Sequence, residues 1–188
     1  MEDGLDCRQC AAGDQNACAR LFQRYEPVIA KQMWRFSRDR RVCEELVQDV
    51  FVEAYLSIER YQDRGVPFEH WLRRIATRVG YRYWKKEARR KKEVAIEAAA
   101  DVAANEEFAS PADASAAAKV LHELLARLPA ADRLVLTMMY FEECDIAMMA
   151  ERTGWPRAIV KMRAFRARRR LKKMIEGDKR IARMLESL

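Results

Sequence analysis

Residues 145–173, DIAMMAERTGWPRAIVKMRAFRARRRLKK, constrain the fold of this chain more than any other stretch. Asp145 is a good N-cap for a short helix, Gly154 permits the left-handed turn that ends it, and Pro156 stands where a second helix starts. The second helix is rich in Lys and Arg and has no acidic residue up to Lys173. Such a pair is typical of a helix-turn-helix that enters a DNA major groove. A corner of an all-helical fold with a solvated basic face is the alternative.

The whole chain favours helix over sheet. It has 188 residues, 50% of them hydrophobic, with only six Gly and five Pro and long runs rich in Ala, Arg, Glu and Leu. We therefore predict an all-α protein, made of two small helical domains joined by a flexible linker. The net charge of +7 fits a polyanionic partner. No apolar stretch approaches twenty residues and no leader is recognisable, so neither membrane insertion nor secretion is expected.

The first half predicts a core of helices. One helix is expected after Asp14, kinked or broken at Pro27, and the next begins after Asp39. From Val42 to Ile58 the apolar residues keep helical spacing, which predicts a buried face. The opposite face is polar and acidic, and by spacing alone it is a solvated surface; it carries Glu45, Gln48, Asp49 and Val52.

A third helix begins near Phe68, where apolar residues recur at helical spacing as far as Tyr83. Between positions 73 and 92 its other faces collect ten basic residues against one acid, Glu87, with aromatic residues interleaved. Basic side chains neutralise phosphates and aromatic rings accept unstacked bases, so this pattern indicates single-strand binding. Trp71 is expected in the core, and Trp84 is a second candidate for it. The candidates that share one exposed face are Arg78, Tyr81, Arg82 and Lys85.

Composition changes sharply at residues 96–118, which contain eleven alanines, five acids and no base. This segment is predicted to be an acidic linker between a first domain, 1–95, and a second, 119–188. In the second domain we expect helices from Lys119 to Leu128 and from Ala131 to Phe141, then the helix-turn-helix. An amphipathic tail helix is expected after Gly177.

Nothing in the chain predicts catalysis. Its two histidines fall in separate domains, and it has neither a dense carboxylate cluster nor a glycine-rich phosphate loop. Cys7 and Cys10 form a C-x-x-C motif, but no second Cys/His pair follows at ligand spacing, so metal binding or redox chemistry is the lesser alternative. Cys18, Cys43 and Cys144 fit helical patterns as small buried residues. We expect no cofactor, no metal and a reducing, cytoplasmic environment.

The ordered motifs resemble those of bacterial sigma factors of the sigma-70 family, extracytoplasmic-function group. Residues 45–51, ELVQDVF, and the later Phe68-x-x-Trp71-Leu72-x-x-Ile75-Ala76 have the spacing of the family's promoter-melting domain. Leu128-Pro129, Arg133, residues 150–154 and residues 160–168 resemble its promoter-upstream domain. The resemblance covers roughly residues 18–175, and each motif gains specificity from the order of the set.

This resemblance implies a role for each surface. The Glu45, Gln48, Asp49 and Val52 face would dock the clamp of core RNA polymerase, whose flap is a further expected contact. Promoter DNA is the second implied partner, and an anti-sigma factor is the third. The non-template strand of the minus-ten element would be held by Asp63, Arg64, Phe68, Arg78, Tyr81, Arg82 and Lys85. The minus-thirty-five duplex would be contacted by Arg157, Lys161, Met162, Arg163, Phe165 and Arg166.

Two departures from the family pattern affect the predicted melting surface. The family commonly has Asn at the position of Arg78 and Asp at the position of Arg82, so both changes add positive charge there. The other function that the sequence allows is a helix-turn-helix regulator that is not a polymerase subunit. The Glu45 to Phe51 motif, with the basic and aromatic helix behind it, favours the sigma factor because a regulator does not need either.

Overall fold

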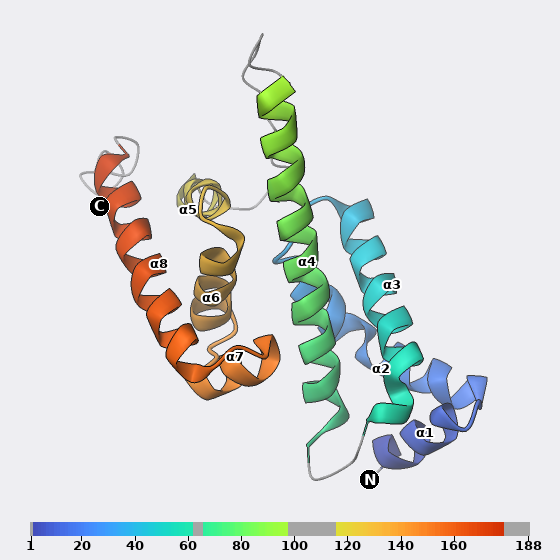
Figure 1. Cartoon of the computed structure of the whole chain (residues 1–188). Helices are drawn as coiled ribbons and strands as arrows, with labels where there is room; N and C mark the ends of the chain where they lie inside the picture. The colour runs from blue at the N-terminus through green and yellow to red at the C-terminus, as the bar shows by residue number, and fades with distance from the viewer. Residues whose placement is uncertain (1, 62–65, 98–115, 179–188) are drawn as a thin grey trace. The chain divides into compact units, whose positions relative to one another are not determined.

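The structure, a computed structural model, describes residues 2–61, 66–97 and 116–178 (Figure 1). Within these residues it contains helices and no strand, which confirms the prediction of an all-α protein. The chain divides into two compact units, Met1–Tyr83 and Trp84–Leu188. The elements in order are α1 Glu2–Ala11, α2 Gln15–Met33, α3 Arg40–Ser57, the 3-10 helix η1 Ile58–Arg60, α4 Phe68–Glu97, α5 Ala116–Ala126, α6 Ala130–Phe141, α7 Ile146–Thr153 and α8 Arg157–Gly177.

Side-chain caps fix where α2 and α3 begin. The Asp14 carboxylate accepts hydrogen bonds from the Asn16 and Ala17 amides at 2.8 and 3.2 Å. Asp39 does the same for the first turn of α3, accepting from the Arg41 amide at 2.8 Å. Each cap satisfies helix N–H groups that have no intrahelical partner, typically worth about 1 kcal/mol. Both helix starts are as the sequence predicts.

Pro27 does not break α2, contrary to the expectation from sequence. The helix continues from Gln15 to Met33 with Pro27 inside it. Proline has no N–H to donate to the carbonyl four residues earlier, which belongs to Gln23. Both residues lie on the exposed side of α2, where water can bond that carbonyl. The helix therefore tolerates the lost hydrogen bond because packing of its buried face holds it.

The third predicted helix, α4, buries the expected apolar face. Leu72, Ile75 and Ala76 are fully inaccessible to solvent. One buried polar contact ties α4 to α2: the Gln32 side-chain amide donates to Thr77 Oγ1 at 3.2 Å. Gly80 lets the Phe36 ring pack closely against α4, since a Cβ at this position would lie 2.5 Å from ring atoms of Phe36.

The N-terminal helix α1 was not predicted. Asp6 and Asp3 pair with Arg20 and Arg24 of α2, and the Tyr25 hydroxyl donates to Asp3 at 2.6 Å. Burial and the neighbouring Asp3 carboxylate raise the pKa of Tyr25 above its ordinary value. The ion pairs therefore hold α1 against the first half of α2.

A disulfide joins the same two helices, which the expected reducing environment did not predict. Cys10 is bonded to Cys18, whose Cα lies 4.8 Å away, and not to a metal or to Cys7. Cys7, Cys43 and Cys144 are buried thiols. The C-x-x-C motif gives no sign of this bond, because the partner of Cys10 lies eight residues further along the chain, in α2.

The second unit is built on α8. One buried cluster includes Ala167 of α8, Leu125 of α5 and Leu136 of α6. Leu128, just after α5, belongs to the same cluster. The turn between α7 and α8 has the predicted chemistry: Asp145 accepts from the Met148 amide at 2.7 Å, and Gly154 has φ of 74°. α8 then begins directly after Pro156.

Parts of the predicted organisation lie outside the described residues. These are Asp63, Arg64, residues 98–115 of the predicted linker, and the tail after Asp178. The boundaries 1–95, 96–118 and 119–188 stay a prediction.

Candidate functional site

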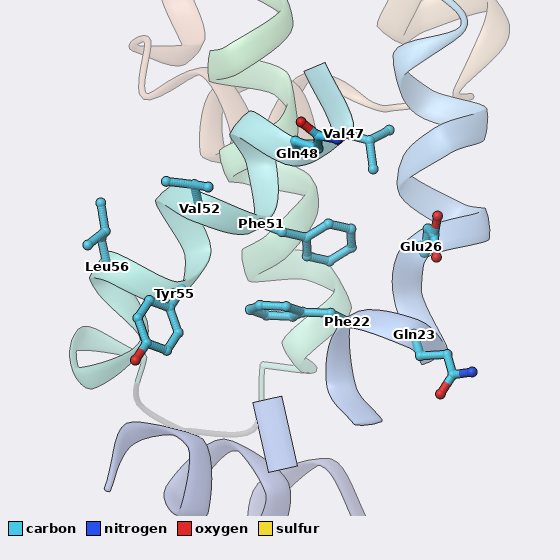
Figure 2. A pocket seen from close by; sticks show the side chains of 9 residues that line it. All are labelled: Phe22, Gln23, Glu26, Val47, Gln48, Phe51, Val52, Tyr55 and Leu56. Atoms are coloured by element: carbon cyan, nitrogen blue, oxygen red, sulfur yellow. The ribbon is translucent and has the colours of Figure 1, made fainter. Parts of the chain in front are cut away.

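An apolar groove of about 530 Å³ lies between α2 and α3 (Figure 2). The rings of Phe22 and Phe51 meet in it, with centroids 4.7 Å apart. Val52, Tyr55 and Leu56 are exposed beside them, Leu56 to 77%. Exposed apolar side chains gathered in one place mark interaction sites on soluble proteins. The groove, called the α2–α3 groove below, is lined by Phe22, Gln23, Glu26, Val47, Gln48, Phe51, Val52, Tyr55 and Leu56.

The predicted polymerase-binding residues lie on α3 at this groove and beside it. Gln48 and Val52 line it. Glu45 and Asp49 are exposed on the same helix without lining the groove. The polar edge of the groove was predictable from the sequence, and its apolar wall was not predicted. Positions 52, 55 and 56 could have revealed it, since their i, i+3, i+4 spacing makes a second apolar stripe on α3.

The predicted melting surface on α4 is a charged face, called the α4 face below: Arg78, Tyr81, Arg82 and Lys85. Arg82 donates to the Glu53 carboxylate of α3 at 2.5 Å, and Arg78 lies 3.5 Å from the other oxygen of that carboxylate. Tyr81 is half-buried, and Lys85 is exposed. The two family departures therefore share one acidic partner that the sequence analysis did not single out.

Phe68 is a correction to the predicted minus-ten set. Its side chain is 1% exposed, so it cannot face a partner in this conformation. It lies in an aromatic cluster, with ring centroids of Tyr25, Tyr61 and Trp71 each 5.4 Å from its own. An apolar ring at the first position of a helix gains more from burial than from exposure. Phe68 therefore anchors the start of α4.

The predicted duplex-reading residues lie on α8, and five of them are exposed. Phe165 is exposed to 62% and Met162 to 37%. Positions 157, 161 and 165 follow one another at i, i+4 and i+8, so they share a side of the helix. The exposed set, called the α8 face below, is Arg157, Lys161, Met162, Phe165 and Arg166.

Arg163, the sixth predicted reader, lies on another side of α8. Its guanidinium stacks over the Trp155 ring at 4.8 Å and is 4.0 Å from the Asp132 carboxylate of α6. Asp132 is 4% exposed in its side chain and also pairs with Arg170. These contacts attach α8 to α6 and to the turn before it. Arg163 was predicted together with the five residues of the α8 face, but its contacts lie with Trp155 and Asp132 instead.

Two other kinds of feature, a metal-binding cluster and a membrane-spanning helix, are both absent from the described residues. In residues 2–61, 66–97 and 116–178 no group of three His, Cys, Asp or Glu side chains is placed to hold a metal ion. No helix in those ranges has both the length and the apolar character needed to cross a membrane. The candidate sites are therefore the α2–α3 groove, the α4 face and the α8 face.

Two family profiles match this chain in order. Sigma-70 region 2 matches residues 21–90, and Sigma-70, region 4 matches residues 118–171. The first range contains the α2–α3 groove and the α4 face, and the second contains the α8 face.

Full-length relatives agree with the two profiles. The ECF RNA polymerase sigma factor SigW of Bacillus subtilis (strain 168) is 26% identical over 181 residues, covering 89% of this chain and 94% of the relative. SigM of the same organism is 29% identical over 156 residues, covering 81% and 91%.

Solved structures share the fold. CnrH, in complex with the cytosolic domain of CnrY, matches with a TM-score of 0.61 and 22% identity, covering 95% of this chain and all of that one. RpoE of Bartonella quintana, in complex with the anti-sigma factor NepR, matches with a TM-score of 0.60 and 19% identity, covering 86% and 98%.

Proposed function

This chain belongs to the sigma-70 family of RNA polymerase sigma factors, in the extracytoplasmic-function group, and we propose which of its surfaces carries each step of transcription initiation. As an alternative sigma factor it serves promoter recognition by core RNA polymerase. The observation that carries this conclusion is the presence of region 2 and region 4, in order, in one chain that its relatives match along most of their length.

The α2–α3 groove is the proposed docking site for the polymerase clamp. Its apolar wall supplies area to bury, and Leu56 and Val52 are largely exposed until a partner covers them. Glu45 and Asp49 stand beside it as exposed acids, so the matching surface should carry basic residues around an apolar centre. Truncation of the apolar wall should weaken binding mainly by speeding dissociation. Removal of the rim acids should mainly reduce the association rate.

The α4 face is the proposed holder of the melted non-template strand. Arginine and lysine would neutralise its phosphates while the Tyr81 ring stacks on an unpaired base. Unstacking a base step costs a few kcal/mol, which binding of the extruded bases offsets, so no covalent chemistry is required of this chain. Asp63 and Arg64 belong to the same proposal by resemblance.

The α8 face is the proposed reader of the minus-thirty-five duplex. Arg157, Lys161 and Arg166 can bond guanine edges or phosphates, and Met162 and Phe165 can pack against thymine methyl groups. Arg163 belongs to the family-derived set, and its contacts with Trp155 and Asp132 support an orienting role for it instead.

We also propose an anti-sigma protein as a partner and the cytoplasm as the place of action. An exposed apolar groove favours a partner that covers it whenever polymerase is absent. RpoE of Bartonella quintana, which shares this fold, was solved with such a protein bound. At the α2–α3 groove such a partner would compete directly with the polymerase clamp.

Transcription by purified core RNA polymerase on a promoter pool tests the proposal. The wild-type chain should give transcripts with defined start sites, and the Gln48→Ala/Asp49→Ala variant should lose them. The Arg40→Ala/Glu44→Ala variant is the matched control, since it removes an exposed pair from the same helix. If the chain binds duplex DNA and core gains no specific transcripts, it acts as a helix-turn-helix regulator and the proposal fails.

A further inference from the structure

Glu53 holds both arginines that depart from the family pattern. Its two carboxylate oxygens lie 2.5 Å from Arg82 and 3.5 Å from Arg78. The Glu53 side chain is 28% exposed, whereas those of Arg78 and Arg82 are 47% and 60% exposed. A carboxylate shared by two guanidinium groups offers them anionic oxygen acceptors, as a phosphate does. Arg78 and Arg82 are therefore accessible to DNA, but each is already paired with the Glu53 carboxylate.

The position of Glu53 on α3 joins two surfaces. It follows Asp49 by one helical turn and is adjacent to Val52 in the α2–α3 groove. It reaches across to Arg78 and Arg82 on α4 from the helix that carries the groove wall. A single acid is therefore shared between the helix proposed to bind polymerase and the helix proposed to hold the melted strand.

We propose that Glu53 is a specificity-determining residue that competes with DNA phosphates for Arg78 and Arg82. This inference rests on the proposed role of the α4 face in holding the non-template strand. A phosphate from DNA of any sequence must displace the Glu53 carboxylate before it pairs with either arginine. The net free energy of binding for that phosphate is therefore less favourable than for a phosphate that meets an unpaired arginine.

Sequence-dependent contacts are not reduced in this way. Contacts that other side chains make with base edges carry the sequence information, and they do not compete with the Glu53 carboxylate. Glu53 thus lowers the sequence-independent part of binding and leaves the base-dependent part, which raises the ratio between promoter and other DNA. The additional positive charge of Arg78 and Arg82 is retained without a matching increase in non-specific affinity.

Binding of a fluorescent oligo-dT 20-mer to the full chain without polymerase tests the competition directly. Glu53→Gln keeps the size of the side chain and removes its charge. We expect it to raise affinity about two- to fivefold, the range that exposed ion pairs span. The slope of log affinity against log salt should steepen by about 0.7 for each arginine that gains a phosphate.

Two comparisons separate this effect from a general change in charge. Glu44→Gln removes the same charge from α3, where Glu44 pairs with Arg40 at 2.8 Å, and it should change affinity much less. In an Arg78→Gln/Arg82→Gln background, Glu53→Gln should have no effect beyond that of Glu44→Gln. Equal effects of Glu53→Gln and Glu44→Gln, or an undiminished effect without the two arginines, would overturn the proposal.

The same variants with core polymerase test specificity. Glu53→Gln should lower the ratio of promoter to non-promoter binding of the assembled polymerase, and an unchanged ratio counts against the role of Glu53. Absence of specific transcription by the wild-type chain would instead refute the proposed function, whereas the oligo-dT measurement still reports on the competition. The two failures are therefore distinguishable.

Discussion

Replacing Gly80 by alanine places a methyl group between α4 and Phe36, in the turn that follows α2. The added Cβ would lie 2.5 Å from three ring atoms of Phe36. Non-bonded carbons rest about 3.5–4.0 Å apart, so the ring or the helix must move by roughly 1 Å. Phe36 is 3% exposed, which leaves the ring little space into which it can turn. The substitution therefore tests whether α4 is held as close to the turn after α2 as the structure has it.

Two opposing terms set the magnitude. Overpacking a core typically costs about 1–3 kcal/mol. Alanine is better than glycine inside a helix by about 1 kcal/mol, which offsets part of this cost. We expect Gly80→Ala to destabilise the first unit by about 1 kcal/mol, a fall in melting temperature of about 4–8 °C for a domain of this size. Hydrogen exchange of the α2 and α4 amides in the full chain measures this unit separately.

Two further variants isolate the contact. Gly177→Ala adds a methyl group to α8 where nothing lies within 4 Å, so it should not destabilise the protein. Phe36→Leu removes the ring, and Gly80→Ala should then be neutral or stabilising. If Gly80→Ala alone stabilises α4 by the full helix-propensity gain, or if Phe36→Leu leaves its cost unchanged, the packing argument is wrong.

Four other predictions concern the groove, the second unit and the cysteines. Leu56→Asp should weaken binding to core polymerase about ten- to a hundredfold in fluorescence anisotropy, because burying a leucine is worth about 1.5–3 kcal/mol, while Leu5→Asp on α1 should not. Asp132→Asn should lower the unfolding free energy of the second unit by about 2 kcal/mol in urea, between the values for exposed and buried ion pairs. Burial raises the pKa of the Cys43 thiol from 9.0 to about 11. The unfolded thiol then ionises first, so thermal stability should fall between about pH 9 and 11, and less so in Cys43→Ala. Alkylation of the unfolded, unreduced chain should label three cysteines, and five after reduction, because Cys10 and Cys18 are bonded to each other.

Local signals made much of the fold predictable. Asp14, Asp39 and Asp145 cap helices within three residues of themselves, and Gly154 meets a conformational demand at its own position. The buried face of α4 follows from periodicity in the same way. Pro27 shows where such reasoning fails, because packing along the rest of α2 outweighs one missing hydrogen bond.

The candidate sites were predictable only where one helix defines them. Five of the six residues that the resemblance assigns to α8 are exposed on one helix, and Arg163 is not among them because it packs on Trp155 and near Asp132. The α2–α3 groove was not predictable, because Phe22 and Phe51 are distant in sequence and meet only when two helices pack. The pairing of Glu53 with Arg82 has a similar cause, since an acid near the end of α3 gives no sign of the α4 residue that it faces.

The carbonyl of Gln23 loses its regular helical N–H donor to Pro27, and Gln23 lines the α2–α3 groove. A backbone acceptor is present whatever side chain occupies the position. Alanine scanning of the groove would therefore pass over it, since no alanine substitution at Gln23 removes the atom. Only substitution of Pro27 itself, which returns an N–H to the helix, would reveal whether a partner's donor uses that oxygen.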